Sequence, residues 1–465
     1  MQQKMLFRLI VVLTILHGPV SAMQVDTILT NGRIHTLNPE QPEANALAIR
    51  AGVIVVVGDV ETVASLAGRD TEIVDLNGKT VLPGFHDMHV HPLFAGIRQT
   101  ECAIAQGSTL ERIRHEVQGC IDRTDAGGWI TGGQWDAHAI GQVPDRSLLD
   151  SISPDHPVLL SDTSGHSAWA NSRALAIAGV TAATPNPEGG IIERDSAGEP
   201  TGILREAAIL LVSGQAPPHS DEKLRAALGW SMQKMLSYGI TSFTEASTGF
   251  VAGMDREVKL YAEMADAGQV KQRVRLCLNW EPGNSELEAI ITERNLYART
   301  NVTIDCIKIF LDGVPTDSHT AAMLEPYAQP MAGRDDETSR YGLLLVEQDI
   351  LNEAVTRFDR MGLTVKFHAA GDAAVRAGLN AFEAARTANG FSSQLHDVGH
   401  CTFVAKADLP RARAIGATFE VSPYLWSPSP INDDISKEVG EERIKRVWPV
   451  REMLEANALV VAGSD

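Results

Sequence analysis

Apolar and polar positions alternate over short stretches in the first part of the chain. Up to residue 85, apolar runs end in Asn-Gly, Ala-Gly or Gly-Asp pairs, within residues 26–37, 46–59 and 71–84. Alternating runs separated by such turn residues predict short β-strands joined by tight turns. Residues 23–85 are therefore predicted to form part of a small flanking β-sandwich.

From residue 230 onward, the pattern changes to apolar runs separated by helical segments. The runs are residues 239–246, 274–280, 305–313, 363–372, 396–404, 417–425 and 458–465. Segments between them, such as residues 351–362, place apolar residues three to four apart, and several end in Gly. Together with a strand that runs through His91, this gives eight β-α repeats. The predicted fold class is α/β, a (β/α)₈ TIM barrel over residues 86–465.

A long segment separates the first two predicted barrel strands, at about residues 100–225. It is too long for a simple connection between a strand and a helix. We therefore expect an inserted subdomain after strand one that covers the mouth of the barrel.

A cluster of histidines lies in the segment VLPGFHDMHVHPLFAG, residues 81–96. Residues 80–84 predict a strand followed by a turn, and His89 and His91 lie on the next extended stretch. Alternate residues of a strand point to the same side, so both imidazoles would project together. The pair suits two ligands of one cation, although the polar face of a half-exposed strand would give the same pattern.

Further polar side chains occur where other barrel strands are predicted to end. They are Lys308 in the run 305–313, His368, His400 and Asp465. In such barrels the site forms at the C-terminal ends of the strands. These four side chains are therefore expected to converge with His89 and His91.

With these residues in place, the sequence resembles the amidohydrolase superfamily. The resemblance is strongest to the family 3 branch, which includes N-substituted formamide deformylase-like proteins. The matching segments are LPGFHDMHVH, WITGGQWD, SGHSAWANSRAL, KIFLDG, HAAGD, the Gly-His of strand six and the terminal GSD. The resemblance implies a barrel with a flanking β-sandwich and one or two divalent metal ions, with zinc the expected metal. It implies that His89 and His91 bind the more buried ion and that His368 and His400 bind the second.

The resemblance also implies the roles of Lys308 and Asp465. Lys308 would bridge the ions after its amine has added CO₂ to form a carbamate, and Asp465 would contact the buried ion and shuttle protons. The expected activity is hydrolysis of a carbon–nitrogen bond of an amide, formamide or related carbonyl substrate by a metal-bound hydroxide. A lactone or ester hydrolase on the same site, and a metal-free binding protein or inactive fragment, are the alternatives.

Several residue roles stay open from the sequence. Lys308 could instead pair with Asp312, and His396 competes with His400, which the family pattern favours. The residues predicted to bind the small-molecule substrate are His166, Trp135 and His319. A core position for the tryptophan and a capping role for His319 are the structural alternatives.

The N-terminus predicts export. Lys4 and Arg8 precede a short apolar core at residues 9–16, and Ser21 and Ala22 precede a cleavage position. Residues 1–22 are therefore predicted to be a signal peptide of a periplasmic or secreted protein, with no membrane contact after its removal. In an oxidising compartment Cys102 and Cys120 could pair, while Cys277, Cys306 and Cys401 are expected to be buried thiols.

Charge and chain length add two expectations. The formal net charge of −19 argues against a nucleic-acid or anionic-membrane partner. The sequence leaves open whether the protein forms a homodimer. The chain stops at Asp465, whereas the resembling proteins continue through the returning strands of the sandwich, so we expect a fragment that binds metal weakly and aggregates.

Overall fold

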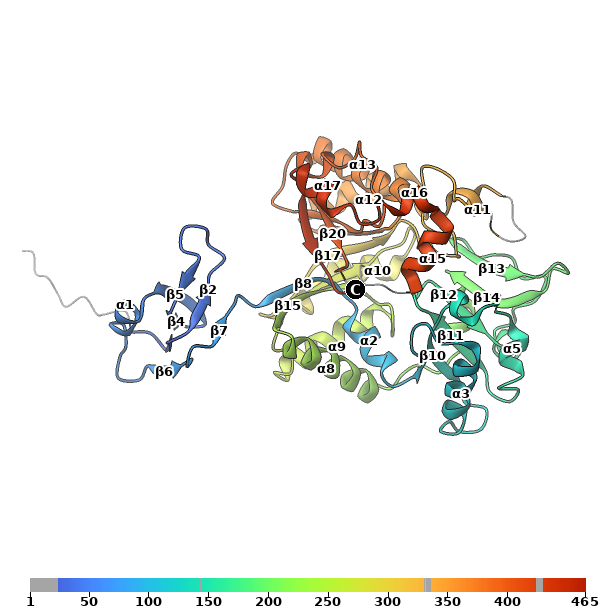
Figure 1. Ribbon diagram of the computed structural model, residues 1–465, viewed down its shortest axis with the longest axis horizontal. Helices are drawn as coiled ribbons and strands as arrows, with labels where there is room; N and C mark the ends of the chain where they lie inside the picture. The colour runs from blue at the N-terminus through green and yellow to red at the C-terminus, as the bar shows by residue number, and fades with distance from the viewer. Residues whose placement is uncertain (1–23, 143, 330, 332–335, 424–429) are drawn as a thin grey trace, which may run out of the picture. The chain divides into compact units, whose positions relative to one another are not determined.

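The computed structural model describes residues 24–142, 144–329, 331, 336–423 and 430–465 (Figure 1). The predicted signal peptide, residues 1–22, lies outside these ranges. The chain divides into two compact units between Gly84 and Phe85.

The first unit contains two small sheets. The four-stranded sheet has the order β5-β4-β1-β6, and the second has the order β3-β2-β7. The strands are β1 Thr27–Thr30, β2 Arg33–His35, β3 Glu43–Ala44, β4 Ala46–Arg50, β5 Val53–Gly58, β6 Glu72–Asp75 and β7 Thr80–Val81, and one helix, α1 Val60–Ala64, lies among them. Val25, Ile28, Ala46, Ala48 and Val63 form its core. Strand β3 lies between two of the apolar runs, and the other six strands lie within the runs that predicted them.

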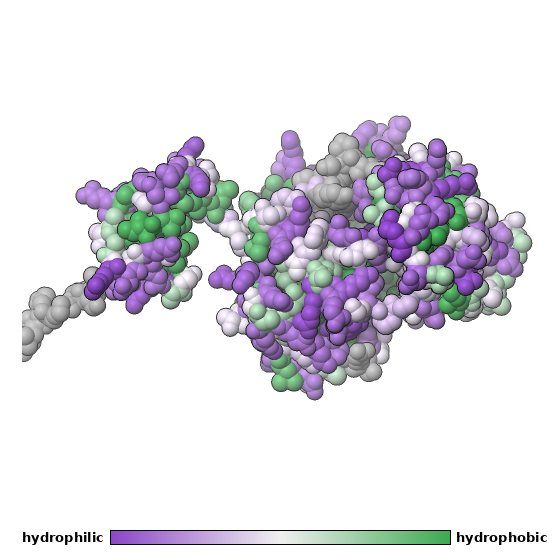
Figure 2. Space-filling view, turned by 90° about the horizontal axis from the view of Figure 1, so that it is seen from below, coloured by the Kyte–Doolittle hydropathy of each residue, from purple (hydrophilic) through white to green (hydrophobic). Residues whose placement is uncertain are grey.

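Large apolar side chains are also exposed on the first unit. Val53, Ile54 and Ile73 have 61%, 57% and 59% of their surface exposed. Figure 2 shows a hydrophobic area on one face of this unit. The small sheets therefore bury some of their apolar side chains and leave others exposed to solvent.

The second unit contains an eight-stranded parallel sheet, which confirms the predicted TIM barrel. Its order is β8-β15-β16-β17-β18-β19-β20-β21. The strands are β8 Phe85–Val90, β15 Ile240–Thr248, β16 Arg273–Asn279, β17 Val302–Phe310, β18 Thr364–Ala369, β19 His396–His400, β20 Ala417–Val421 and β21 Leu459–Ala462. Each overlaps one of the apolar runs in the sequence.

The first and last strands approach each other and nearly close the barrel. The backbone N–H of Asp465 donates to the carbonyl of His89 at 2.7 Å. The backbone N–H of Ser464 donates to Asp87 at 2.9 Å. The end of β21 is therefore held beside the end of β8, where the histidine pair lies.

Helices between the strands cover the barrel (Figure 1). They are α2 Pro92–Arg98, α8 Asp221–Ser237, α9 Met254–Asp266, α10 Ser285–Glu293 with the 3₁₀ turn η1 Arg294–Leu296, α12 Gln348–Arg360, α13 Asp372–Asn389, α14 Arg411–Ala414 and α17 Val450–Glu455. Helix α12 buries Leu351, Val355 and Phe358, which share one face at helical spacing. Three further helices, α11 Glu337–Tyr341, α15 Pro430–Val439 and α16 Glu441–Ile444, lie in the loops after strands β17 and β20.

The predicted insertion after strand one forms a six-stranded sheet with the order β13-β14-β12-β11-β10-β9. Its strands are β9 Cys102–Ala103, β10 Ile130–Trp135, β11 Val158–Asp162, β12 Ser167–Ala170, β13 Gly190–Arg194 and β14 Pro200–Glu206. Its helices are α3 Leu110–Ile121, α4 Ala137–Ile140, α5 Arg146–Asp150, α6 Ser172–Ile177 and α7 Ile209–Ser213. Arg205 on β14 forms an ion pair with Asp317 at 3.1 Å, so the subdomain contacts the loop that follows barrel strand β17.

The cysteines correct one expectation from the sequence. Cys102 and Cys120 form a disulfide and Cys401 is a buried free thiol, as expected. The expectation that Cys277 and Cys306 are free thiols is wrong, because they form a second disulfide. They occupy directly paired positions of β16 and β17, a register that is not visible in the sequence.

Among the described residues, no helix combines the length and the apolar character that crossing a bilayer requires.

Candidate metal centre

The six side chains predicted to hold metal converge at the C-terminal ends of the barrel strands. His89 lies on β8, Lys308 on β17, His368 on β18 and His400 at the end of β19. His91 directly follows β8, and Asp465 lies three residues after the end of β21. The imidazole centroids of His368 and His400 lie 4.4 Å apart, and those of His89 and His400 lie 4.6 Å apart. Parallel strands bring these residues together because the carboxyl ends of all eight strands meet at one end of a barrel.

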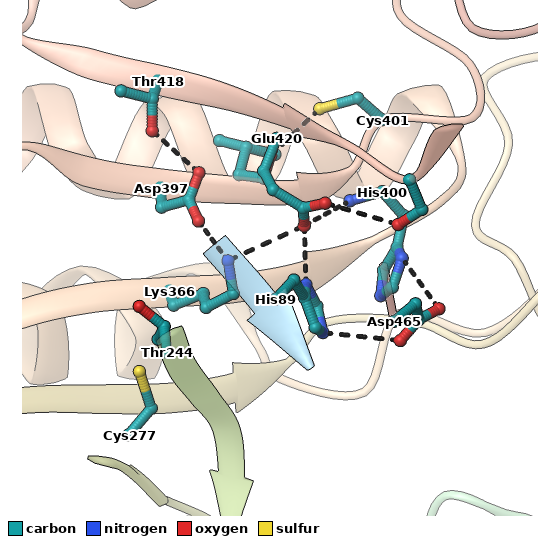
Figure 3. A network of polar contacts seen from close by, with 12 residues as sticks. His89, Thr244, Cys277, Lys366, Asp397, His400, Cys401, Thr418, Glu420 and Asp465 are labelled. Atoms are coloured by element: carbon teal, nitrogen blue, oxygen red, sulfur yellow. Dashed lines mark hydrogen bonds and ion pairs between the residues drawn. The ribbon is translucent and has the colours of Figure 1, made fainter. Parts of the chain in front are cut away.

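Asp465 lies among three of the histidines. Its carboxylate oxygens lie 3.7 Å from Nε2 of His89, 3.6 Å from Nε2 of His91 and 3.7 Å from Nδ1 of His400. Figure 3 shows Asp465 between His89 and His400. Because 31% of its side chain is exposed, Asp465 can also meet a molecule that enters from solvent.

The donor atoms suit a divalent cation. One donor atom each from His89, His91 and Asp465 lie within 4.8 Å of one another, and the same holds for His89, His400 and Glu420. Burial, followed by the nearby Lys308 ammonium, lowers the pKa of His89 well below its ordinary value. Burial likewise lowers the pKa of His400, with His368 and Lys308 adding to the effect. Neutral imidazole and carboxylate are the ligands that zinc prefers, so the residues fit the metal that the resemblance implies.

Lys308 is buried at the base of the centre. Its Nζ lies 3.2 Å from Nε2 of His89. Burial, together with the neighbouring Lys366 ammonium, lowers the pKa of Lys308 to about 7. Asp312, the alternative partner considered for Lys308, instead accepts backbone hydrogen bonds from Ala322, Ala370 and Gly371 at 2.8–3.0 Å. Asp312 therefore ties together the loops that follow β17 and β18.

The structure separates His400 from His396, which competed for the same role. Residue His396 begins β19 and lies at the opposite end of the strand from His400. Its Nδ1 accepts a hydrogen bond from the backbone of Val365 at 3.0 Å, and its Nε2 lies 3.1 Å from Asp359. Both ring nitrogens of His396 are thus engaged away from the centre.

Of the three residues predicted to bind substrate, only His166 lies next to the centre. Its ring centroid is 4.9 Å from that of His368, and its Nδ1 lies 2.9 Å from Glu206. Burial alone lowers the pKa of His166, but the Glu206 carboxylate outweighs it and raises this pKa to about 9. His166 comes from the turn between β11 and β12, so the inserted subdomain contributes a polar group to the site.

Trp135 and His319 are buried in structural positions. Trp135 is 2% exposed, donates its indole N–H to the carbonyl of Leu160 at 2.8 Å and packs against Trp169 in the subdomain core. His319 is 1% exposed, and its two ring nitrogens lie 2.8 Å from the Ser339 carbonyl and 2.9 Å from Glu438. The position of Trp135 matches its core alternative. The contacts of His319 join two segments rather than cap a helix, and contact of either residue with substrate stays a prediction.

Two carboxylates beside the histidine pair were not singled out from the sequence. Glu420 on β20 lies 2.6 Å from Nδ1 of His89, and Glu245 on β15 lies 3.4 Å from Nδ1 of His91. The hydroxyl of Tyr261 donates to Glu245 at 3.0 Å. For Glu420 the available signal was a charged residue in a short, mostly apolar strand, because a buried carboxylate needs a partner. Glu245 lies among Ser and Thr residues and gave no such signal.

Comparison with known proteins agrees with the geometry. The sequence pattern that describes the amidohydrolase family matches residues 72–465. The protein LONG AFTER FAR-RED 3 of Arabidopsis thaliana is 31% identical over 462 residues, which covers 96% of this chain and 76% of that protein. The N-substituted formamide deformylase of Arthrobacter pascens is 27% identical over 454 residues, or 95% of this chain and 80% of that enzyme.

A solved structure is similar over most of the chain. The uncharacterized metal-dependent hydrolase from Pyrococcus furiosus superposes with a TM-score of 0.68 at 25% identity, and the match covers 94% of this chain and 85% of that one. The similarity therefore extends from sequence segments to the arrangement of the whole barrel.

Proposed function

The chain belongs to the amidohydrolase family and is a metal-dependent hydrolase, and on this premise we propose that it cleaves the carbon–nitrogen bond of an amide, formamide or related carbonyl compound. The observation that carries the proposal is the carboxylate of Asp465, within 3.7 Å of a ring nitrogen of each of three histidines. Similarity to the N-substituted formamide deformylase supports the type of bond.

We propose that the centre holds zinc. His89, His91 and Asp465 would hold one ion, His368 and His400 would hold a second, and Lys308 would serve both. When bound, such an ion polarises a carbonyl oxygen and makes water acidic enough to act as a nucleophile near neutral pH. Carbamylation of Lys308 is part of the proposal: its uncharged amine adds CO₂, forms a new N–C bond and releases a proton. Burial supports this step, because it favours the uncharged amine.

Asp465 is proposed to move the proton of the reaction. Its carboxylate is partly exposed and lies beside the histidines, where a water molecule and the scissile carbonyl would meet. It would accept the proton of the attacking water at a carboxylate oxygen and return it to the leaving nitrogen, which must be protonated to depart as an amine.

His166 is proposed to orient the substrate. Glu206 holds Nδ1 of its ring, and the ring faces His368 across the site. A ring fixed in this way can donate a hydrogen bond to an oxygen of the substrate without reorganising during the reaction.

We also propose that the protein is exported after removal of residues 1–22. The disulfides Cys102–Cys120 and Cys277–Cys306 support this location, because such bonds persist in oxidising compartments. A homodimer stays a prediction.

The test compares substrates with matched leaving groups: an N-substituted formamide, a simple amide, an ester and a lactone. We expect release of the amine from the formamide or amide, loss of that activity after chelation and recovery on addition of zinc. Hydrolysis of only the ester or lactone would assign the alternative activity. A purified protein that binds no divalent metal would support a binding protein instead.

A further inference from the structure

Three charged side chains are buried inside the barrel, below the candidate metal centre. They are Lys366 on β18, Asp397 on β19 and Glu420 on β20, and their exposed fractions are 1%, 3% and 0%. Lys366 donates to Asp397, and its Nζ lies 3.6 Å from Oε2 of Glu420. Figure 3 shows this line of side chains leading toward His89.

The strand register explains how the three groups meet. Lys366 is paired with Asp397 across β18 and β19, and Asp397 is paired with Thr418 across β19 and β20. The Thr418 hydroxyl donates to the second oxygen of Asp397 at 2.7 Å. Asp397 is thus held from two sides, and Lys366 is held between two carboxylates.

A buried group of this kind is not needed to fill a barrel. Barrel interiors are usually packed with branched apolar side chains, and a buried ion pair rarely stabilises more than an apolar replacement of the same volume. The contacts of Lys366, Asp397 and Glu420 therefore indicate a role other than stabilising the barrel.

Glu420 connects the group to two residues of the centre. The same carboxylate oxygen lies 2.6 Å from Nδ1 of His89 and accepts a long hydrogen bond, 3.4 Å, from the backbone N–H of His400. With Nδ1 engaged in this way, Nε2 of His89 faces Lys308 and Asp465. His400 adopts a φ of 70°, which a residue other than glycine seldom does, so its backbone needs support from its surroundings.

We propose that Glu420 and Lys366 are positioning residues of the metal centre. Glu420 fixes the ring of His89 and the backbone of His400, and Lys366 fixes Glu420 from below. The inference rests on the proposed metal site and adds the buried group that orients its ligands. A partner that orients a ligand imidazole typically changes metal affinity by about 10–100-fold when it is removed.

The first test is zinc affinity of the purified protein with Glu420→Gln, measured by competition with a chromogenic chelator. Lys366 keeps Asp397 as its partner in this variant, so the buried charges stay paired. We expect zinc to bind about 10–100-fold more weakly than to the unaltered protein. We also expect a changed visible spectrum of the cobalt-substituted protein, which reports ligand geometry and would not respond to a purely structural role.

The matched control is Asp359→Asn. Asp359 and His396 form another buried carboxylate–imidazole pair, 3.1 Å apart, at the opposite end of β19. This variant should lose stability but keep the zinc affinity and the cobalt spectrum. If Glu420→Gln binds zinc as tightly as the unaltered protein, the positioning role of Glu420 is wrong. Should Glu420→Gln not fold, Glu420→Asp carries the same test, because it keeps the charge and shortens the reach to His89.

Lys366 is tested by the double variant Lys366→Met with Asp397→Asn. It removes one positive and one negative charge, so the net charge of the buried group is unchanged, and Glu420 loses its support. We expect weaker zinc binding here too, and unchanged binding would remove Lys366 from the proposal. Failure of the unaltered protein to bind zinc would instead count against the proposed function.

Discussion

At the scale of single residues, the site depends on Asp465, whose carboxylate lies at 3.6–3.7 Å from ring nitrogens of three histidines. A carboxylate in this position can serve both as a metal ligand and as the group that carries a proton. The two roles make different demands, because an amide side chain can still offer an oxygen to a cation but cannot take up the proton of an attacking water molecule.

Asp465→Asn is therefore expected to lower kcat by about 10²–10⁴-fold, the usual contribution of a general acid–base group. Steady-state kinetics with the best amide substrate would measure the effect. Asp372→Asn is the control, because Asp372 accepts a hydrogen bond from the backbone of Leu324 and lies outside the proposed ligand set. Equal kcat values for Asp465→Asn and the unaltered protein would exclude the proton-transfer role.

At the scale of elements, the strands deliver the ligands and their register decides which residues meet. Phe310 on β17 is paired with His368 on β18, and Ala369 on β18 is paired with His400 on β19. The last strand matters most, because Gly463 lies against β8. A side chain at this position would place its Cβ 2.4 Å from Cβ of His89.

Gly463→Ala should separate the end of β21 from β8 and move Asp465 away from the histidines. Inserting a methyl group into such a contact costs about 1–3 kcal/mol. We expect a lower melting temperature and weaker zinc binding, measured on the same preparation. Gly229→Ala is the control: Gly229 lies within α8, with Met264 as its nearest neighbour at 3.9 Å, and alanine there should stabilise the helix. Similar behaviour of the two variants would contradict the close contact at Gly463.

The Cys277–Cys306 disulfide joins two neighbouring barrel strands across a sequence separation of 29 residues. Closing a loop of this length stabilises a protein by about 3.6 kcal/mol through the entropy of the unfolded chain. The variant Cys277→Ala with Cys306→Ala should lose about that much free energy of unfolding in a denaturant titration. Reaction of these cysteines with a thiol reagent in the native, unreduced protein would show that the bond is absent.

The sequence predicted the strands and the histidines well because both leave local patterns. The apolar runs overlap all eight barrel strands, and His89 and His91 share a side because they are two residues apart. Glu245, Glu420 and the Cys277–Cys306 bond were missed because they depend on register between strands that are distant in sequence. Trp135 was predicted to bind substrate, but it is only 2% exposed in the sheet of the inserted subdomain, a packing that the sequence does not reveal.

At the scale of the whole molecule, stability should depend on pH through groups outside the metal centre. Asp359 at the end of α12 accepts hydrogen bonds from Arg386 and Asn389 of α13 and from Ser392, at 2.7–2.9 Å, and lies 3.1 Å from His396 of β19. Burial raises the pKa of Asp359, but hydrogen bonds from His396, Asn389 and Ser392 outweigh this and hold the pKa well below its ordinary value. Asp359 therefore links two helices and a strand.

Because this pKa is lowered by folding, the stability that Asp359 contributes is present above the unfolded pKa of about 4 and is lost as the pH falls below it. At neutral pH, Asp359→Asn should cost about 3–5 kcal/mol, since it breaks a buried pair. The difference in free energy of unfolding between Asp359→Asn and the unaltered protein should shrink as the pH falls below about 4. Melting temperatures measured over this pH range would show the change.

The control for this pH series is Asp266→Asn. Asp266 pairs with Arg299 at 2.6 Å but is 57% exposed, so solvent screens the pair and its loss should change stability little at any pH. If Asp359→Asn lowers the melting temperature by the same amount at every pH, the pH dependence of stability does not come from Asp359.

The central claim for the whole molecule is that one cation is bound by side chains at the ends of the first and the last barrel strand. Anomalous diffraction at the zinc absorption edge, from crystals of the protein grown with zinc, tests it most directly. The account predicts a peak about 2.0–2.2 Å from Nε2 of His89, Nε2 of His91 and a carboxylate oxygen of Asp465. A zinc peak bound by other residues, or no peak at these three, would contradict it.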